Sequence, residues 1–269
     1  NNLGVLFKDS EKYEDAIKMF TKAKELQPDH QNSYYNLALI KKEQGQSEEA
    51  IELLLKVLDL NPEHKDAKLH AQRDSNDLGI KLHKEGNYKL ALKYFKIVVV
   101  LAPTEYFGYF NLGNTYYEIK DYKNAEVSFK KTITFKPEYD SAHANLGATY
   151  RHLGNIEKSL SSYGEAIKTN PENASNYYGR AVTLKEAERI EDAEENYKTA
   201  IRLDPKHIGS QHNLALIYKE RGQVKKALVM VTNILEFATS NPEINYSAGI
   251  WNLQLGHWTE GWKYYEYRW

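Results

Sequence analysis

The chain has 269 residues, with 36 basic and 37 acidic side chains and a formal net charge of −1. This balance gives no reason to expect a nucleic-acid or anionic-membrane partner, and we expect neither kind. The absence of cysteine excludes disulfides, thiolate nucleophiles and cysteine-based zinc sites. No apolar run approaches the roughly 18–20 residues of a membrane helix, and no signal segment opens the chain, so we expect a cytoplasmic protein.

Proline divides the chain at regular intervals. The chain has seven prolines, at Pro28, Pro62, Pro103, Pro137, Pro171, Pro205 and Pro242. Four of the six spacings are 34 residues, and the others are 41 and 37. Because proline cannot continue a helix, each one marks a break, and a fixed period of this length is typical of a repeat array.

The repeats follow one another along the whole sequence, which we interpret as a single array over 1–269 and as a fragment of a longer chain. We expect about seven and a half repeats, at about 1–30, 31–64, 72–105, 106–139, 140–173, 174–207, 208–241 and 242–269. Residues 65–71 are an insertion of seven residues, about two helical turns, which predicts either a longer helix or a bend in the array. Pro242 comes three residues late, which predicts a second helix about one turn longer in repeat 208–241.

Repeat 106–139 shows the pattern that the others share. Tyr109, Leu112, Gly113 and Tyr116 occupy one helical face, and a second helical pattern begins at Tyr122 after a polar break. Each repeat is therefore predicted to be two helices joined by a tight turn. Such a hairpin cannot bury both faces alone, so neighbouring hairpins must supply the rest of the core.

Small and aromatic residues recur at fixed places in the repeats. They include Leu3, Gly4, Phe7, Ala16, Phe20 and Ala23 in the first repeat, Leu78, Gly79, Ala91 and Phe95 in the third, and Leu146, Gly147, Tyr150, Tyr163 and Ala166 in the fifth. This pattern resembles the tetratricopeptide repeat (TPR) family over essentially the whole chain. The resemblance implies an all-α fold, an α-solenoid of antiparallel helix pairs in a right-handed superhelix, whose first helices line a concave face.

One polar position recurs in the first helix of the repeats, and its members form what we call the amide row. They are Asn2, Asn36, Asp77, Asn111, Asn145, Gly179 and Asn213. Asn111 lies about 200° around the helix from Gly113, so it is predicted to face away from the hairpin core. An exposed asparagine is less favourable in a helix than alanine, and the sequence shows no structural role that would compensate for this. The row resembles the asparagine ladder of the TPR region of O-GlcNAc transferase and is interrupted at Asp77 and Gly179. Inheritance from one ancestral repeat remains an alternative explanation.

Residues beside the row are candidates for selective contacts with a peptide. These are the aromatic residues Tyr35, Phe110 and Tyr178, the amide Asn114, and the cations Lys42 and Lys185. Packing between repeats is the alternative explanation for the aromatic residues, and solvation at helix ends is the alternative for the lysines. The lysine–asparagine clamp for C-terminal carboxylates seen in co-chaperone TPR domains is excluded, because no lysine stands at its first position.

The sequence contains no phosphate loop, zinc-protease or dinucleotide-binding motif, so we expect no cofactor, no metal site and no enzyme activity in this segment. The predicted function is a scaffold that binds an extended peptide or partner segment in the concave groove. The alternative is the substrate-recruiting arm of a larger glycosyltransferase, because the aromatic segment LGHWTEGWKYYEYRW resembles the last repeat of bacterial TPR chains that continue into such a domain. In that case a catalytic domain would follow Trp269 in the same chain.

Overall fold

The computed structural model describes residues 2–9 and 12–266, and all of the regular structure in those ranges is helical. The helices are α1 Asn2–Asp9, α2 Tyr13–Leu26, α3 Gln31–Glu43, α4 Ser47–Leu60, α5 Lys65–Lys84, α6 Tyr88–Leu101, α7 Tyr106–Glu118, α8 Tyr122–Phe135, α9 Asp140–His152, α10 Ile156–Thr169, α11 Ala174–Glu186, α12 Ile190–Leu203, α13 Ile208–Glu220, α14 Val224–Leu235, α15 Pro242–Gln254 and α16 Trp258–Tyr265. The predicted all-α solenoid is thereby confirmed.

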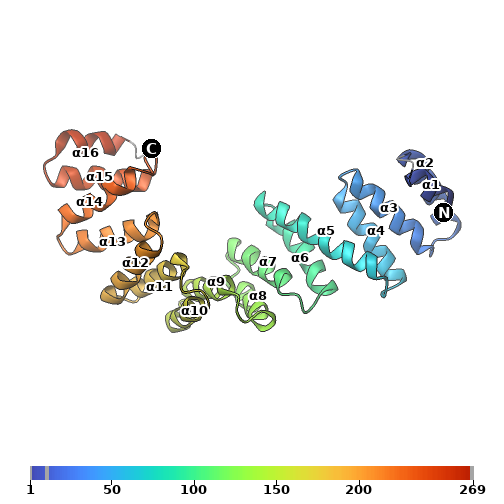
Figure 1. Cartoon of the computed structure of the whole chain (residues 1–269), viewed down its shortest axis with the longest axis horizontal. Helices are drawn as coiled ribbons and strands as arrows, with labels where there is room; N and C mark the ends of the chain where they lie inside the picture. Colours follow the sequence, from blue (N-terminus) through green and yellow to red (C-terminus); the bar gives the residue numbers. More distant parts are fainter. Residues whose placement is uncertain (1, 10–11, 267–269) are drawn as a thin grey trace. The chain divides into compact units, whose positions relative to one another are not determined.

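The chain divides into two compact units, the N-terminal unit (1–136) with α1–α8 and the C-terminal unit (137–269) with α9–α16. In each unit an odd-numbered helix packs against the even-numbered helix that follows it, and that helix packs against the next odd-numbered one. Figure 1 shows these consecutive pairs as hairpins in each unit. Each hairpin therefore shares its core with its neighbours, as expected for a solenoid.

An aromatic ring packed on a glycine backbone closes several of the hairpins. A Cβ atom added at Gly113 of α7 would lie 2.6 Å from the Phe129 ring of α8, and one added at Gly79 would lie 2.6 Å from the Phe95 ring. The Phe129 and Phe95 rings are almost completely buried. Burial of one such ring stabilises the fold by roughly 1.5–3 kcal/mol, and only a residue without a side chain lets it approach this closely.

Histidine side chains cap three of the odd-numbered helices. The ring Nδ1 of His30 accepts a hydrogen bond from the backbone N–H of Ser33 at 3.2 Å, and His207 accepts one from Ser210 at 3.1 Å. His64 accepts one from Ala67 at 3.1 Å in the same way. These bonds satisfy N–H groups that have no partner within the helix, so the histidines that follow the repeat-end prolines are turn residues.

The extra residues of the two irregular segments, the insertion 65–71 and the end of repeat 208–241, form different structures. The seven-residue insertion is helical and makes α5 the longest helix, at 20 residues. The prediction of a longer second helix in repeat 208–241 is wrong, because α14 has only 12 residues and ends at Leu235. The additional residues lie in the connection before α15. There Asn241 accepts hydrogen bonds from the backbone N–H groups of Glu243 and Ile244, and Pro242 occupies the first turn of α15.

In the part of the chain that the structure describes, the turns inside seven hairpins each contain a residue with positive φ. Gly154 has φ of +73°, whereas Lys120 holds the same place in repeat 106–139 with φ of 62°. A residue with a side chain pays about 1–2 kcal/mol in this left-handed region. A Cβ added at Gly154 would meet no atom within 4 Å, so the cost there is purely conformational.

We therefore predict opposite effects at these two turns. Gly154→Ala should destabilise the protein by about 1 kcal/mol, and Lys120→Gly should stabilise it by up to about 1 kcal/mol after the entropy of the added glycine is subtracted. Urea unfolding of the two variants beside the parent chain measures both changes. Equal signs for the two changes would show that the backbone conformation is not what decides stability at these turns.

Candidate functional site

The amide row is the first feature of the candidate site. Asn111 and Asn145 are half-buried, and Asp77 is exposed. Asn2 begins α1, but its side chain lies outside the described residues, as do Asn1 and Trp269. We call the side of an odd-numbered helix that carries its row member the row face, and each unit is considered separately.

Three side chains of the amide row donate hydrogen bonds to other groups of the protein. Asn36 donates to the backbone carbonyl of Asn32 at 2.8 Å, and Asn213 donates to that of Gly209 at 2.9 Å. Asn111 donates to the Oδ1 atom of Asn76 at 2.9 Å. We expected these asparagines to make no contribution to the structure, and this expectation is wrong, because their hydrogen bonds hold the side chains in place.

Threonine side chains behind the row tie its backbone to the helix. The buried hydroxyl of Thr115 donates to the Asn111 carbonyl at 2.7 Å, and that of Thr149 donates to the Asn145 carbonyl at 2.7 Å. Thr183 makes the same bond to Gly179 at 3.0 Å. The threonine positions are completely buried, so they belong to the core and not to the row face.

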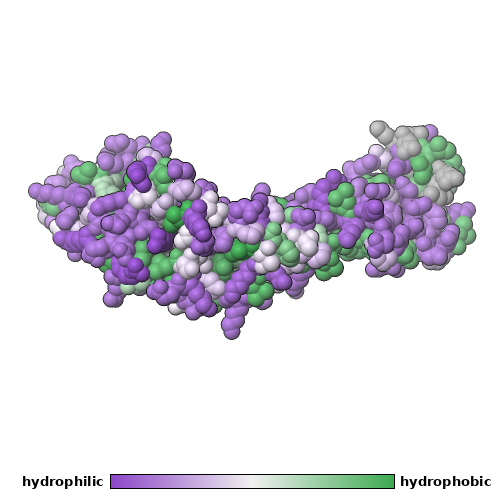
Figure 2. Space-filling model, turned by 60° about the horizontal axis from the view of Figure 1, so that its bottom comes forward, coloured by the Kyte–Doolittle hydropathy of each residue, from purple (hydrophilic) through white to green (hydrophobic). Residues whose placement is uncertain are grey.

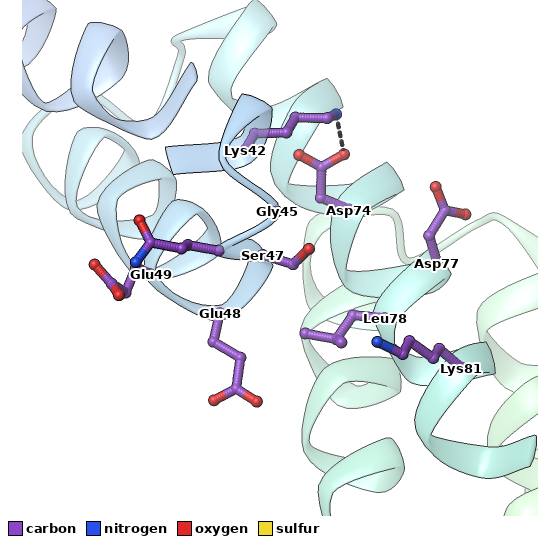
Figure 3. Close-up of a pocket in the computed structure, with 10 residues that line it drawn as sticks. Lys42, Gly45, Ser47, Glu48, Glu49, Asp74, Asp77, Leu78 and Lys81 are labelled. Atoms are coloured by element: carbon purple, nitrogen blue, oxygen red, sulfur yellow. Dashed lines mark hydrogen bonds and ion pairs between the residues drawn. The ribbon is translucent and has the colours of Figure 1, made fainter. Parts of the chain in front are cut away.

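A cavity of about 570 Å³ opens on the N-terminal unit where the row is interrupted by Asp77. Figure 3 shows Lys42 reaching from the end of α3 to pair with Asp74 of α5, while Lys81 and Leu78 lie further along α5. Asp74 is only 7% exposed, and among the described residues its Oδ2 atom has no hydrogen-bond partner. The lining of this cavity carries an excess of negative charge, because two lysines face four carboxylates, those of Glu48, Glu49, Asp74 and Asp77.

The second interruption of the row, Gly179, also lies at a cavity. This cavity has a volume of about 230 Å³ and lies between α9 and α11 in the C-terminal unit, with Asn145, Tyr163 and Tyr178 among its lining residues. A Cβ atom added at Gly179 would be 2.3 Å from the Tyr163 ring and 2.6 Å from its hydroxyl oxygen. The ring of the preceding hairpin therefore excludes an asparagine from this place.

The three predicted aromatic contacts all pack within the protein while remaining partly accessible. Tyr35 lies against the rings of His64 and His70, with centroid distances of 5.1 and 5.9 Å. Tyr178 lies 5.0 Å from the His207 ring, and Phe110 lies 6.0 Å from the Phe129 ring. The Phe110 contact lies within one hairpin, whereas Tyr35 and Tyr178 contact the histidines that cap α5 and α13. Packing between repeats thus accounts for part of the role of the two tyrosines, and contact with a peptide remains a prediction.

The predicted cations are engaged in ion pairs between neighbouring hairpins. Lys42 pairs with Asp74, and Lys185 lies 3.7 Å from Glu220. Arg151, one repeat before Lys185, donates to Glu186 at 2.6 Å. Lys42, Lys185 and Arg151 lie near the C-terminal ends of their helices, where the helix dipole favours a positive charge.

Asn114, the remaining predicted contact, is half-buried on α7.

Sequence reasoning did not identify Asp74, His70 or Tyr163 as part of the site. Asp74 and His70 lie on α5, and the His70 Nδ1 atom is buried with no hydrogen-bond partner among the described residues. Burial, followed by the charges of Lys42 and Arg73, lowers the pKa of His70. The one available signal was the insertion, because His70 belongs to it and Asp74 follows it.

The surface outside the row face gives less indication of a site. Hydrophilic residues cover most of the face seen in Figure 2, with apolar patches between them. Trp258 and Trp262 of α16 are exposed, in line with the aromatic segment noted in the sequence. Within the described ranges, no helix has the length and apolar character needed to cross a membrane, and no three His, Cys, Asp or Glu residues are grouped to hold a metal ion.

Family models of the tetratricopeptide repeat match residues 1–63, 108–139, 145–208 and 196–229, which together make up more than half of the chain. None of the curated proteins matches the sequence.

Three of the solved structures that share the fold are TPR proteins. YrrB, a TPR protein with an unusual peptide-binding site, is 22% identical with a TM-score of 0.55 over 72% of this chain and 96% of that one. A thermophilic TPR protein of Thermus thermophilus is 22% identical with a TM-score of 0.57 over 68% and 100%. The C-terminal part of a TPR repeat-containing protein from Cytophaga hutchinsonii is 19% identical with a TM-score of 0.60 over 91% and 98%. At these identities the likeness establishes the fold.

The C-terminal unit contains a buried histidine whose pKa is lowered. His212 of α13 is 5% exposed, and its Nε2 atom lies 2.9 Å from the Ser247 hydroxyl oxygen. Burial lowers the pKa of His212, Glu243 opposes that shift, and Lys185 adds to it. Below the ordinary histidine pKa of about 6.5, the unfolded chain takes up a proton that the folded ring resists.

We therefore predict that stability decreases as the pH falls from about 6.5, and that His212→Gln removes part of this decrease. Urea unfolding of both proteins at pH values from about 7.5 to 5 measures it. Parallel pH profiles for the two proteins would rule out His212 as the source.

Proposed function

The chain belongs to the tetratricopeptide repeat family, and we propose that it binds an extended peptide, or an extended segment of a partner protein, along the row face. Proteins of this family are scaffolds for protein–protein interaction, and the proposal specifies which side of the hairpins the partner contacts.

The observation that carries the proposal is that a cavity on each unit contains a member of the amide row. Asp77 lines the cavity of the N-terminal unit, and Asn145 and Gly179 line that of the C-terminal unit. Recognition sites for small ligands and side chains are concave, with a few well-placed polar groups. The row face offers both features.

The chemistry of the row suits a peptide backbone. A primary amide has two donor hydrogens and one acceptor oxygen, so it can bond to either group of a peptide unit. Asn36 and Asn213 each donate to a carbonyl four residues earlier, and the Asn36 Oδ1 atom also accepts a hydrogen bond from Lys8 at 3.3 Å. The side chains are thus held in place before a partner arrives, which lowers the entropy that binding costs.

The aromatic residues supply contacts that a backbone-directed row lacks. Tyr35 and Tyr178 are half-buried, so each presents part of a rigid ring beside the row. Rings of this kind contribute contact area at little conformational cost. The peptide-binding site of YrrB, which shares the fold, gives this proposal further support.

We predict that replacing row amides weakens peptide binding without unfolding the protein. The ligand is a peptide selected from a random displayed library against the full chain, and its affinity is measured by fluorescence anisotropy. In a double variant, Asn111→Ala and Asn213→Ala should each contribute a loss of roughly 1 kcal/mol in binding free energy.

A matched control distinguishes a lost contact from a lost internal bond. Asn196 of α12 donates to the Asp192 carbonyl at 2.8 Å, in the same pattern as Asn213, but it lies on an even-numbered helix. Asn196→Ala should leave affinity unchanged. If the row variant binds as tightly as the parent, or if Asn196→Ala weakens binding equally, the row face is not the binding surface.

A further inference from the structure

The cavity of the C-terminal unit arises at a position that carries an unusually small residue. Ala148 of α9 lines it and is half-buried. The equivalent residues in the other repeats are all larger, and they are Val5, Leu39, Ile80, Asn114, Val182, Leu216 and Ile250. At this one repeat, therefore, the first helix lacks the side chain that would fill the space beside the row.

Gly179 of α11 removes a second side chain at the same cavity. Any Cβ at this position would overlap the Tyr163 ring, which is 5% exposed and held in the core of the hairpin before it. The space cannot be closed by a larger residue at Gly179 without displacing that ring. Two small residues on neighbouring hairpins thus meet at one hollow, and the fold maintains it.

The lining of the hollow favours an uncharged, apolar occupant. Ala148 and Val182 form an aliphatic wall, Tyr163 and Tyr178 contribute rings, and the polar side chains of Asn145, Ser175 and Asn176 in the lining are uncharged. The charge at its edge is already neutralised, because Arg151 donates to Glu186 at 2.6 Å. A charged occupant would lose its hydration with no free counter-charge, and this costs more than the contacts return.

The size of the hollow narrows the class of occupant. Its volume is about 230 Å³, and an apolar cavity of roughly 150 Å³ can hold a benzene molecule. A leucine, methionine or phenylalanine side chain therefore fits, whereas an alanine side chain would leave most of the space unfilled.

We propose that the Ala148–Gly179 cavity is a specificity pocket that accepts one large apolar side chain of a bound peptide. The inference rests on the proposed function, which supplies the peptide, and it adds a sequence requirement that the amide row by itself does not impose. Asn145 lines the same cavity, and its primary amide has the donors and the acceptor that a peptide backbone can bond to.

A blocked amino acid tests the pocket without an extended peptide. N-acetyl-leucine methylamide is titrated into the ¹⁵N-labelled full chain, and the amide signals of Ala148, Gly179 and Val182 are followed. A ligand of this size should bind with a dissociation constant of roughly 1–10 mM. N-acetyl-glutamine methylamide has similar length but a polar end, so it should bind at least about tenfold more weakly.

Two variants at Ala148 show whether the leucine compound binds inside the cavity. Ala148→Leu should abolish the shifts, because it fills the cavity with the residue that the equivalent position 216 carries. Ala148→Ser leaves the volume almost unchanged and should keep most of the leucine binding. The thermal midpoint of each variant checks its fold, and Ala148→Val serves as the filled variant if Ala148→Leu does not fold.

The outcomes separate this inference from the proposed function. Equal shifts with the leucine and glutamine compounds, persistence of the shifts in the filled variant, or no shifts up to about 50 mM would overturn the pocket. The proposed function is judged by the displayed peptides instead. Displayed peptides that bind through the row while blocked leucine does not bind would leave that function standing without the pocket.

Discussion

The packing of an aromatic ring onto a glycine backbone fixes the geometry on which the rest of the protein depends. Phe20 meets Gly4, Phe95 meets Gly79, Phe129 meets Gly113 and Tyr163 meets Gly147, and in each case a Cβ on the glycine would lie within 3.0 Å of the ring. This contact sets how closely the two helices of a hairpin approach. In these four hairpins it also commits one side of the odd-numbered helix to the core, so the opposite side is available for polar residues and for binding.

A contact of the same kind explains the interruption of the amide row at Gly179. Where the packed ring is Tyr163 instead of phenylalanine, it extends to the next hairpin and requires Gly179 there. A core residue thereby shapes the surface, and the missing amide opens a cavity beside Asn145. A change of one core residue, such as Tyr163, can therefore change which residue is tolerated on the row face, here Gly179.

The period of the prolines and the small and aromatic residues were sufficient to predict the helical hairpins and the family. The prediction that Asn111 faces away from the hairpin core followed from its position on the helix relative to Gly113. The hydrogen bond from Asn111 to Asn76 could not be predicted, because those residues belong to different repeats and their side chains meet only after stacking. The length of α14 was predicted wrongly because a late proline shows where the next helix begins and not where the previous one ends. The Ala148–Gly179 cavity needs both residues placed in space before it becomes visible.

Hydrogen exchange of the full chain with and without a selected peptide tests most directly whether the partner lies on the row face. A bound peptide should slow exchange in the odd-numbered helices, with the strongest effect near Asn145 in α9 and Gly179 in α11. The even-numbered helices, whose contacts lie in the core and on the opposite side, should change little. Protection concentrated on α10 and α12, with α9 and α11 unchanged, would contradict the account.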